Sequence, residues 1–426
     1  MYSIEKIYQN LILFPYIYLL AKLPPPNYRV DHMNFLRRRN QSAPSDDDSD
    51  DVGGSNFQKS RKPPNTAFRQ QRLQAWQPIL TPKSVISVLF LLAIVFAPLG
   101  IAILYTTYHV EKISLDYSHC DTLASGDEFS NVPSKYVDYH FKDNVDPEFQ
   151  WKLQNGTGAD NAQCIVRFTL AKDISPPLYL YYQLTNFYQN HRKYVDSYDL
   201  DQLKGEPVSA DSLTDKCDPL RVNNDGKAVY PCGLIANSLF NDTFSSPVLL
   251  NPQNGENNQT YHFTDKGISW PSDIGTKFRN TTYDPNDIVP PPNWAKRFPQ
   301  GYNETNLPGL EDWEHLQNWM RTSGLPSFYK LYGKNTTEAM SSGTYEMTID
   351  LHYPVTIFGG TKSVVITTNS IFGGRNLALG IIYIIVAIVC LVLAIAFLFQ
   401  HLIKPRRIGD HNFLQGQMEP SFRDQL

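Results

Sequence analysis

Cysteine is the residue type whose number and spacing first point to chemistry in this sequence. Four of its five cysteines, Cys120, Cys164, Cys217 and Cys232, lie in one central segment, a concentration that favours an oxidising compartment and disulfide bonds. Four cysteines allow three connectivities. We expect the sequential one, Cys120–Cys164 and Cys217–Cys232, because the second pair closes a short polar loop. Closing a loop of that size stabilises a fold by roughly 3 kcal/mol.

Asparagine supplies the second chemical signal. Six Asn-x-Ser/Thr sequons fall in the same polar, turn-rich segment, at Asn155, Asn241, Asn258, Asn280, Asn303 and Asn335. A single sequon carries little information, but six in one segment indicate N-glycosylation in the secretory pathway.

Catalytic chemistry has no comparable signal. The sequence contains no glycine-rich phosphate loop, no His-Glu-x-x-His and no Gly-x-Ser-x-Gly. The histidines of the central segment have no ligand spacing and are His109, His119, His140, His191, His262, His315 and His352. We therefore expect no catalytic residue, no metal site and no cofactor, and nothing indicates a nucleic-acid partner.

Two apolar segments frame this central region. Val85 to Tyr105 contains 21 residues without a charge and Leu377 to Phe399 contains 23. A helix of 21 residues is about 32 Å long, enough for a hydrocarbon core of about 30 Å. We expect transmembrane helices over 84–108 and 377–399. Pro98 and Gly100 predict a kink in the first span.

Small residues in the two spans would admit a closely packed partner helix, and they are Ala93, Ala97, Ala378 and Gly380. The alternative is that they are ordinary span residues. Cys390 lies inside the second span and is interpreted as a small apolar filler.

Charge predicts the orientation of the spans. Residues 1–83 contain 12 Lys/Arg and 7 Asp/Glu, residues 400–426 contain 4 and 3, and residues 109–375 contain 22 and 32. Basic flanks mark the cytosolic side, so both termini are expected there. The predicted organisation is a largely disordered cytosolic tail (1–83), a luminal or extracellular domain (109–376) and a cytosolic C-terminal tail (400–426).

The N-terminal tail has two notable segments. Leu11 to Leu20 is apolar but too short to span a membrane, and the acidic run Asp46 to Asp51 cannot bury enough apolar surface to fold. Met33 is an alternative start to Met1.

The central domain has the pattern of a β protein. Gly343 to Val355 and Cys164 to Leu170 alternate apolar and polar residues, and Leu178 to Leu184 is an aromatic strand. Ser363 to Thr368 follows Gly359-Gly360, which predicts a hairpin. Glu311 to Thr322 has helical spacing. We expect a mainly antiparallel, sandwich-like domain with short helical insertions, between two transmembrane helices.

Several segments together resemble one family, the accessory (β) subunits of type-IV P-type ATPase lipid flippases, the cell-division-cycle-fifty family. Asn65 to Thr81 (NTAFRQQRLQAWQPILT) is similar to its cytosolic signature, and Tyr181 to Tyr194 (YYQLTNFYQNHRKY) to its luminal motif. Further blocks follow in the family's order at 231–243, 268–273, 291–294, 319–322, 353–363 and 373–380. None of the segments that carry the resemblance lies in the first 64 residues. Cys120 and Cys164 are separated by a longer insertion than the family pattern implies. The resemblance therefore supports the Cys120–Cys164 pairing less strongly than the Cys217–Cys232 pairing.

The resemblance implies a non-catalytic subunit that binds a type-IV P-type ATPase one to one and accompanies it from the endoplasmic reticulum. The ATPase moves phosphatidylserine or phosphatidylethanolamine to the cytosolic leaflet, so membrane phospholipids are a further partner. The implied location is the endoplasmic reticulum, Golgi, endosome or plasma membrane. The basic stretch Arg61 to Lys83 would face anionic lipids or the pump.

Two other functions fit the two-span layout. A ligand-gated ion-channel subunit also has two spans and a disulfide-bonded ectodomain, but such ectodomains carry more cysteines, and the second span offers only Tyr383 and Cys390 as pore-lining groups. An ectoenzyme or lipid receptor acting alone would need clustered carboxylates or histidines.

Overall fold

The structure, a computed structural model, describes residues 66–68, 70–73, 80–142, 146–155, 162–250, 252, 257–370 and 373–405. The chain divides into two units, Met1–Gln77 and Pro78–Leu426. In the first unit, the described residues form a turn in which Arg72 N donates to Ala67 O. The predictions for residues 1–65, for the acidic run and for 406–426 lie outside the described residues, as does the side chain of Asn155.

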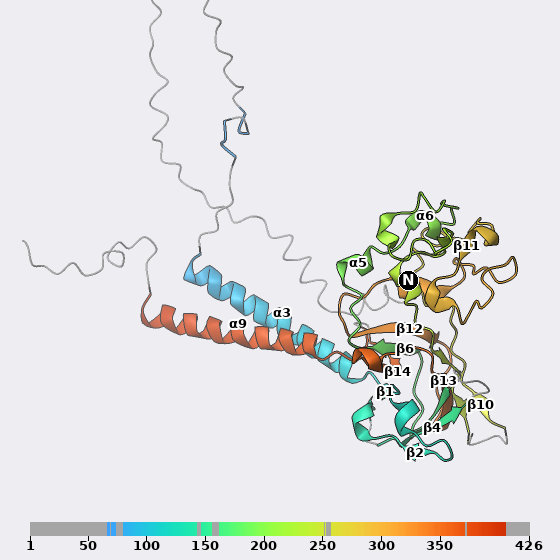
Figure 1. The fold of residues 1–426 in the computed structure, drawn as a ribbon. Coiled ribbons are helices and arrows are strands. Elements are labelled where there is room, and N and C mark those ends of the chain that lie inside the picture. The colour runs from blue at the N-terminus through green and yellow to red at the C-terminus, as the bar shows by residue number, and fades with distance from the viewer. Residues whose placement is uncertain are drawn as a thin grey trace, which may run out of the picture. The chain divides into compact units, whose positions relative to one another are not determined.

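Two long helices of the second unit cover the predicted spans, except that the second helix begins one residue after Leu377. Helix α3 (Pro82–Tyr108) begins where Thr81 Oγ1 accepts a hydrogen bond from the backbone N of Ser84, and it continues through Pro98. Helix α9 (Ala378–Ile403) lies beside it (Figure 1). Both are long and apolar enough to cross a membrane.

The β-domain between these helices contains two antiparallel sheets. The first has the order β12-β6-β14-β1-β3, with bounds Phe328–Asn335, Leu178–Leu184, Lys362–Thr368, Lys112–Asp116 and Val137–His140. The second has the order β10-β9-β13-β5-β4-β2, with bounds Gln259–Thr260, Val248–Leu249, Gly343–Asp350, Ala162–Leu170, Phe149–Asn155 and Ser130–Asn131, and β8 (Thr243–Phe244) pairs with β13. A separate parallel pair joins β7 (Ala228–Val229) to β11 (Ile288–Val289).

Alternation of side chains explains how the two sheets pack. Alternate residues of β6 and of β5 are buried, and the buried side chains of both sheets form one core. The outward face of β5 carries Gln163, Arg167 and Thr169 beside Ile165, and Arg167 Nε lies 2.7 Å from Glu346 Oε2 of β13. The predicted fold class, two apolar helices with a mainly antiparallel β-domain, is confirmed.

Short helices and long loops complete the domain. The α-helices are α4 (Cys120–Leu123), α5 (Arg192–Val195), α6 (Leu200–Leu203), α7 (Leu234–Asn237) and α8 (Glu314–Met320). The 3₁₀ turns are η1 (Ser134–Tyr136), η2 (Asp215–Cys217), η3 (Pro285–Asp287), η4 (Pro292–Trp294) and η5 (Thr356–Phe358).

Helix α8 is shorter than the predicted helix over Glu311 to Thr322. Trp313 precedes it with φ −92° and ψ 75°, and Arg321 follows it with φ −80° and ψ 97°, neither of which is helical. The Arg321 guanidinium forms two hydrogen bonds with the Asp273 carboxylate, which fixes the chain in this extended conformation.

The predicted hairpin of β13 and β14 is wrong, because the two strands lie in different sheets. After Asp350 the backbone N–H groups of His352 and Tyr353 donate to Asp242 Oδ1, and neither continues the β13 ladder. The chain then forms η5 and turns at Gly359, whose φ of +65° suits glycine. These features direct β14 into the first sheet.

Candidate functional site, the helix pair and its junction with the sandwich

Glycine allows α3 and α9 to approach closely. A Cβ atom at Gly100 would lie 2.8 Å from Ile384 Cγ1, and one at Gly380 would lie 2.7 Å from Leu104 Cγ. Both distances are too short for a side chain, so each glycine admits the opposite helix. The sequence pointed to Gly380 as a packing residue, but it pointed to Gly100 only as a source of a kink.

Small and aromatic side chains fill the rest of this contact. Ala93, Ala387 and Ala394 are buried, and the rings of Phe96 and Tyr383 meet edge to face with centroids 5.3 Å apart. The residues that point away from the contact are apolar and exposed, and include Val88, Leu91, Ile94, Ile385, Ile388 and Val392. The pair therefore has an apolar outer surface suited to lipid or to the spans of another protein.

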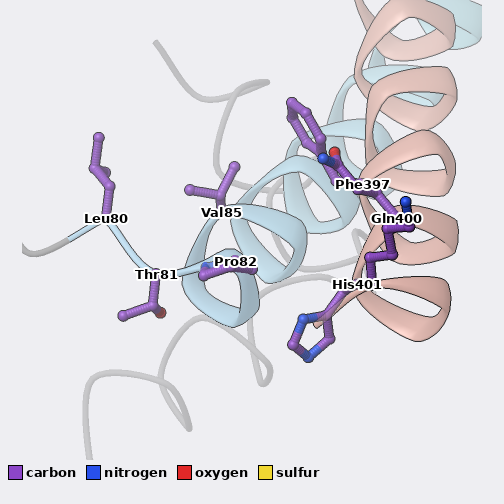
Figure 2. Close-up of a pocket in the computed structure, with 8 residues that line it drawn as sticks. Leu80, Thr81, Pro82, Val85, Phe397, Gln400 and His401 are labelled. Carbon is purple, nitrogen blue, oxygen red and sulfur yellow. The ribbon is translucent and has the colours of Figure 1, made fainter. Parts of the chain in front are cut away.

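A cavity of about 290 Å³ lies between the start of α3 and the end of α9. Figure 2 shows Val85 and Pro82 on one side of it and Phe397, Gln400 and His401 on the other. Leu80, Thr81 and Lys404 complete its lining. The cavity thus combines apolar walls with polar and cationic groups.

The opposite ends of the helices continue into two neighbouring strands. Only residues 109–111 separate α3 from β1, and residues 369–377 separate β14 from α9. The backbone O of Glu111 accepts from Thr368 N (2.9 Å) and from Thr367 Oγ1 (3.0 Å), while Glu111 N donates to Thr368 Oγ1. Tyr108 O lies 2.9 Å from His140 Nε2 of β3. The helix pair is therefore tied to the central strands of the first sheet.

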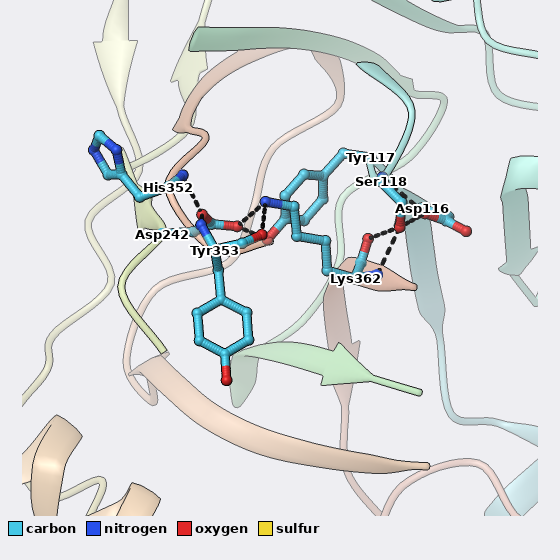
Figure 3. A network of polar contacts seen from close by, with 7 residues as sticks. All are labelled: Asp116, Tyr117, Ser118, Asp242, His352, Tyr353 and Lys362. Carbon is cyan, nitrogen blue, oxygen red and sulfur yellow. Dashed lines mark hydrogen bonds and ion pairs between the residues drawn. The ribbon is translucent and has the colours of Figure 1, made fainter. Parts of the chain in front are cut away.

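A buried polar network lies at the far end of β1 and β14 (Figure 3). Asp242 Oδ2 is 2.7 Å from Lys362 Nζ and accepts from Tyr117 Oη at 2.9 Å. Asp242 Oδ1 accepts from the backbone N–H groups of His352 and Tyr353, both at 2.6 Å. Lys362 Nζ also donates to Tyr353 O at 2.8 Å. Both charges are thus paired and hydrogen-bonded, as burial requires.

The network fixes the protonation of Tyr117. Burial, together with the nearby Asp242 carboxylate, raises the pKa of the Tyr117 hydroxyl well above its ordinary value, so it remains a donor. Next to it, Ser118 Oγ donates to Asp116 Oδ1 and accepts from Lys362 N. No local sequence pattern predicts this network. The only sequence signal is that Asp242 and Lys362 lie in two of the family-like blocks, 231–243 and 353–363.

Several of the family-like blocks contact one another in the folded domain. The indole N–H groups of Trp294 and Trp319 donate to Ala236 O and Ile235 O of α7, at 2.9 and 2.8 Å. Gln189 Oε1 accepts from Ser323 N, which joins block 181–194 to the chain after α8. The blocks therefore build a shared structural core, which explains why they occur together.

Trp270, in block 268–273, differs from the other tryptophans of the domain because 58% of its surface is exposed. The Arg321 guanidinium lies 4.3 Å from the centre of its ring and is itself held by Asp273, with Nε–Oδ2 2.6 Å. An exposed tryptophan held in this way is preorganised for contact with another molecule.

The four cysteines of the domain pair as Cys120–Cys164 and Cys217–Cys232, with Cα–Cα distances of 6.1 and 5.6 Å. The first bond joins α4, which follows β1, to β5 and so links the two sheets. The second closes the polar loop before α7. Cys390 is buried in α9 and unpaired.

The sequons fall into two groups. Asn241, Asn258, Asn280 and Asn303 are exposed, whereas Asn335 is only 8% exposed. Among the described residues, no three His, Cys, Asp or Glu side chains are placed to hold a metal ion. Burial lowers the pKa of His315, whose ring lies against Tyr332 with centroids 4.5 Å apart.

These features define a class of protein, a β-sandwich domain joined to one end of a pair of apolar helices, with bonded polar groups in its core (Figure 1). Comparison with known sequences is more specific. The profile of the LEM3 (ligand-effect modulator 3) family / CDC50 family matches residues 103–407. The chain belongs to this family, which confirms the resemblance found in the sequence.

Curated relatives cover most of the chain. It is 49% identical over 360 residues to the phospholipid-transporting ATPase accessory subunit CRF1 of Saccharomyces cerevisiae, an alignment that covers 84% of this chain and 90% of that one. It is 44% identical to the accessory subunit CDC50 of Chaetomium thermophilum, over 88% and 96% of the two chains. The cell cycle control protein 50A of Bos taurus is 36% identical, over 80% and 89%.

Proposed function

We propose that this chain is the non-catalytic accessory subunit of a phospholipid-transporting ATPase. The observation that carries the proposal is the similarity to relatives named as such subunits, which are 49% and 44% identical over 84% and 88% of this chain, together with the family profile over residues 103–407. The structure is compatible with it, because two helices are too few to enclose a lipid path and closely packed side chains fill the contact between them.

The finer proposal is a one-to-one complex with a type-IV P-type ATPase. In it, this chain stabilises the pump, supports its export from the endoplasmic reticulum and is needed for movement of phosphatidylserine or phosphatidylethanolamine to the cytosolic leaflet. A subunit that binds only the folded pump stabilises it by mass action. The apolar outer surface of α3 and α9 is available for the spans of the pump, and Trp270 for its extracytoplasmic loops.

The proposed topology has both termini in the cytosol and residues 109–376 in the lumen or outside, in an organelle of the secretory or endosomal pathway or at the plasma membrane. The exposed asparagines Asn241, Asn258, Asn280 and Asn303 are then available for glycosylation, with Asn155 as a further sequon. The cavity at the start of α3 would lie at the cytosolic membrane surface, where Lys404 suits an anionic phospholipid headgroup.

The test is purification of the tagged full-length chain from its native cells in mild detergent, followed by mass spectrometry of stoichiometric partners. One P-type ATPase at a one-to-one ratio is the expected result. A homo-oligomer without an ATPase contradicts the proposal and favours the alternative of a two-span channel subunit. Protease protection of N- and C-terminal tags tests the topology, since cytosolic tags are digested in sealed microsomes.

A further inference from the structure

The buried sequon at Asn335 differs in its bonding from the exposed ones. Asn335 Oδ1 accepts from Thr337 N (3.1 Å), Thr337 Oγ1 (3.2 Å) and Glu338 N (3.0 Å). Asn303 Oδ1 makes the same set of contacts, from Thr305 N, Thr305 Oγ1 and Asn306 N. This turn is therefore common to a buried and an exposed sequon, and it cannot distinguish their functions.

The amide nitrogen does distinguish them, and it is the atom to which an N-linked sugar is joined. Asn335 Nδ2 donates to His262 O at 3.0 Å and lies 3.4 Å from Glu338 Oε2. These two acceptors use both hydrogens of the amide. A sugar on Nδ2 would replace one N–H and would have to occupy space that the backbone of residue 262 or the side chain of Glu338 already fills.

The bond to His262 has a structural role. Strand β12 is an edge strand of the first sheet, and Asn335 is its last residue. The segment 261–264 covers that edge, because Thr264 and Lys334 exchange two backbone hydrogen bonds of 2.9 and 3.0 Å. Tyr261 Oη also donates to Glu338 O. Asn335 Nδ2 adds one further hydrogen bond between residues 261–264 and the edge of β12. It thereby helps to cover backbone groups that could otherwise pair with another strand.

We propose that Asn335 is a structural asparagine that fastens residues 261–264 to the edge of β12, and that it carries no glycan in the folded protein although it lies in a sequon. The proposal about glycan occupancy rests on the extracytoplasmic location proposed above. The structural role of Asn335 does not depend on that location.

The first experiment maps glycans on the full-length chain purified in its folded complex. Enzymatic release of N-glycans in heavy-oxygen water converts each glycosylated asparagine to a labelled aspartate, which mass spectrometry detects. We expect label at Asn241, Asn258, Asn280 and Asn303, and an unmodified Asn335 peptide. A glycan on Asn335 in the folded complex overturns the proposal.

The second experiment separates the structural role from the glycan. Asn335→Asp and Asn303→Asp each remove one sequon and keep an oxygen in the Oδ1 position, but only the first removes the donor to His262. On protein trimmed with an endoglycosidase that leaves the first sugar on each asparagine, and so does not convert Asn303 to aspartate, we expect Asn335→Asp to lower the unfolding midpoint by roughly 4 to 8 °C and Asn303→Asp to leave it nearly unchanged.

The outcomes distinguish this inference from the proposed function. Equal midpoints for the two variants overturn the structural role of Asn335. If no sequon carries a glycan but Asn335→Asp still destabilises the protein, the proposed topology fails while the structural role stands.

Discussion

The carboxylate of Asp242 lies 2.7 Å from the ammonium nitrogen of Lys362, with 0% and 7% of the two side chains exposed. The two residues are distant in the sequence and come from opposite sheets, because Asp242 precedes β8 and Lys362 begins β14. A buried pair gains stability only when its remaining polar atoms are bonded as well, and here two backbone N–H groups, one carbonyl and Tyr117 provide those bonds.

Replacing Asp242 leaves the Lys362 charge buried without its partner. We expect Asp242→Ala to lower the free energy of unfolding by about 3 to 5 kcal/mol, measured by chemical denaturation of the purified protein. Asp138→Ala is the matched control, because Asp138 makes an ion pair of the same 2.7 Å length with Lys112 but is 72% exposed, and its loss costs about 0 to 1 kcal/mol. Equal losses would show that burial of the pair is unimportant.

Gly380 keeps the two helices in contact. Gly380→Val places atoms where Leu104 already lies, and we expect a destabilisation of about 1 to 3 kcal/mol. Thermal unfolding in mild detergent measures the change. Ala378→Val, at an exposed position of the same helix, is the control and should behave like the original protein. A harmless Gly380→Val would mean that the close helix contact is dispensable.

The short loop closed by Cys217 and Cys232 has a sequence separation of 15. Replacing both residues by serine should therefore lower the free energy of unfolding by about 3 kcal/mol. Cys390→Ala, which breaks no disulfide, should have little effect. Peptide mapping without reductant checks the connectivity, and a peptide that joins Cys164 to Cys217 would contradict it.

Buried tyrosines predict loss of stability at alkaline pH. Burial raises the pKa of Tyr194 and of Tyr345 from 10.0 to about 12. Because the folded pKa is the higher one, the stabilisation is fully present below pH 10 and is lost as the pH rises from 10 to about 12. Unfolding midpoints and tyrosinate absorbance across this range measure the effect. Tyr194→Phe should weaken the pH dependence, and an unchanged slope would rule out Tyr194 as a source.

Trp270 tests the proposed contact with the ATPase. Since its ring is exposed, Trp270→Ala should leave the unfolding midpoint almost unchanged while it reduces the amount of ATPase recovered with the chain. The buried Trp319 is the contrasting variant, and Trp319→Ala should cost about 3 to 5 kcal/mol in stability. Full recovery of the ATPase with Trp270→Ala would remove this residue from the interface.

Local sequence patterns predict the strands well and their pairing poorly. Leu178 to Leu184 alternates so regularly that the predicted strand has the bounds of β6. The strand predicted over Gly343 to Val355 begins where β13 begins but is five residues too long, since β13 ends at Asp350, and its predicted partner β14 lies in the other sheet. Pairing depends on Asp242, which holds the backbone of His352 and Tyr353, and no local pattern near β13 reveals a carboxylate so far away in the chain.

In the candidate site, too, local sequence predicts the elements but not the contacts between them. Hydropathy alone predicts both long helices, but the sequence around Gly100 predicts only a kink in its own helix, whereas the structure shows that this glycine also admits α9. The six sequons are identical as motifs, and only the burial and bonding of Asn335 separate it from the exposed ones. Properties that depend on neighbours distant in sequence are the ones that required the structure.

The three-residue link between α3 and β1 has a mechanical consequence. Residues 109–111 join α3 to β1, and Glu111 is hydrogen-bonded to both Thr367 and Thr368 of the neighbouring strand, which restrains this short link. Helix α3 and strand β1 are therefore expected to move together. We expect a tilt of α3 to turn the first sheet with it, and a force on the sandwich to act in turn on the helix pair.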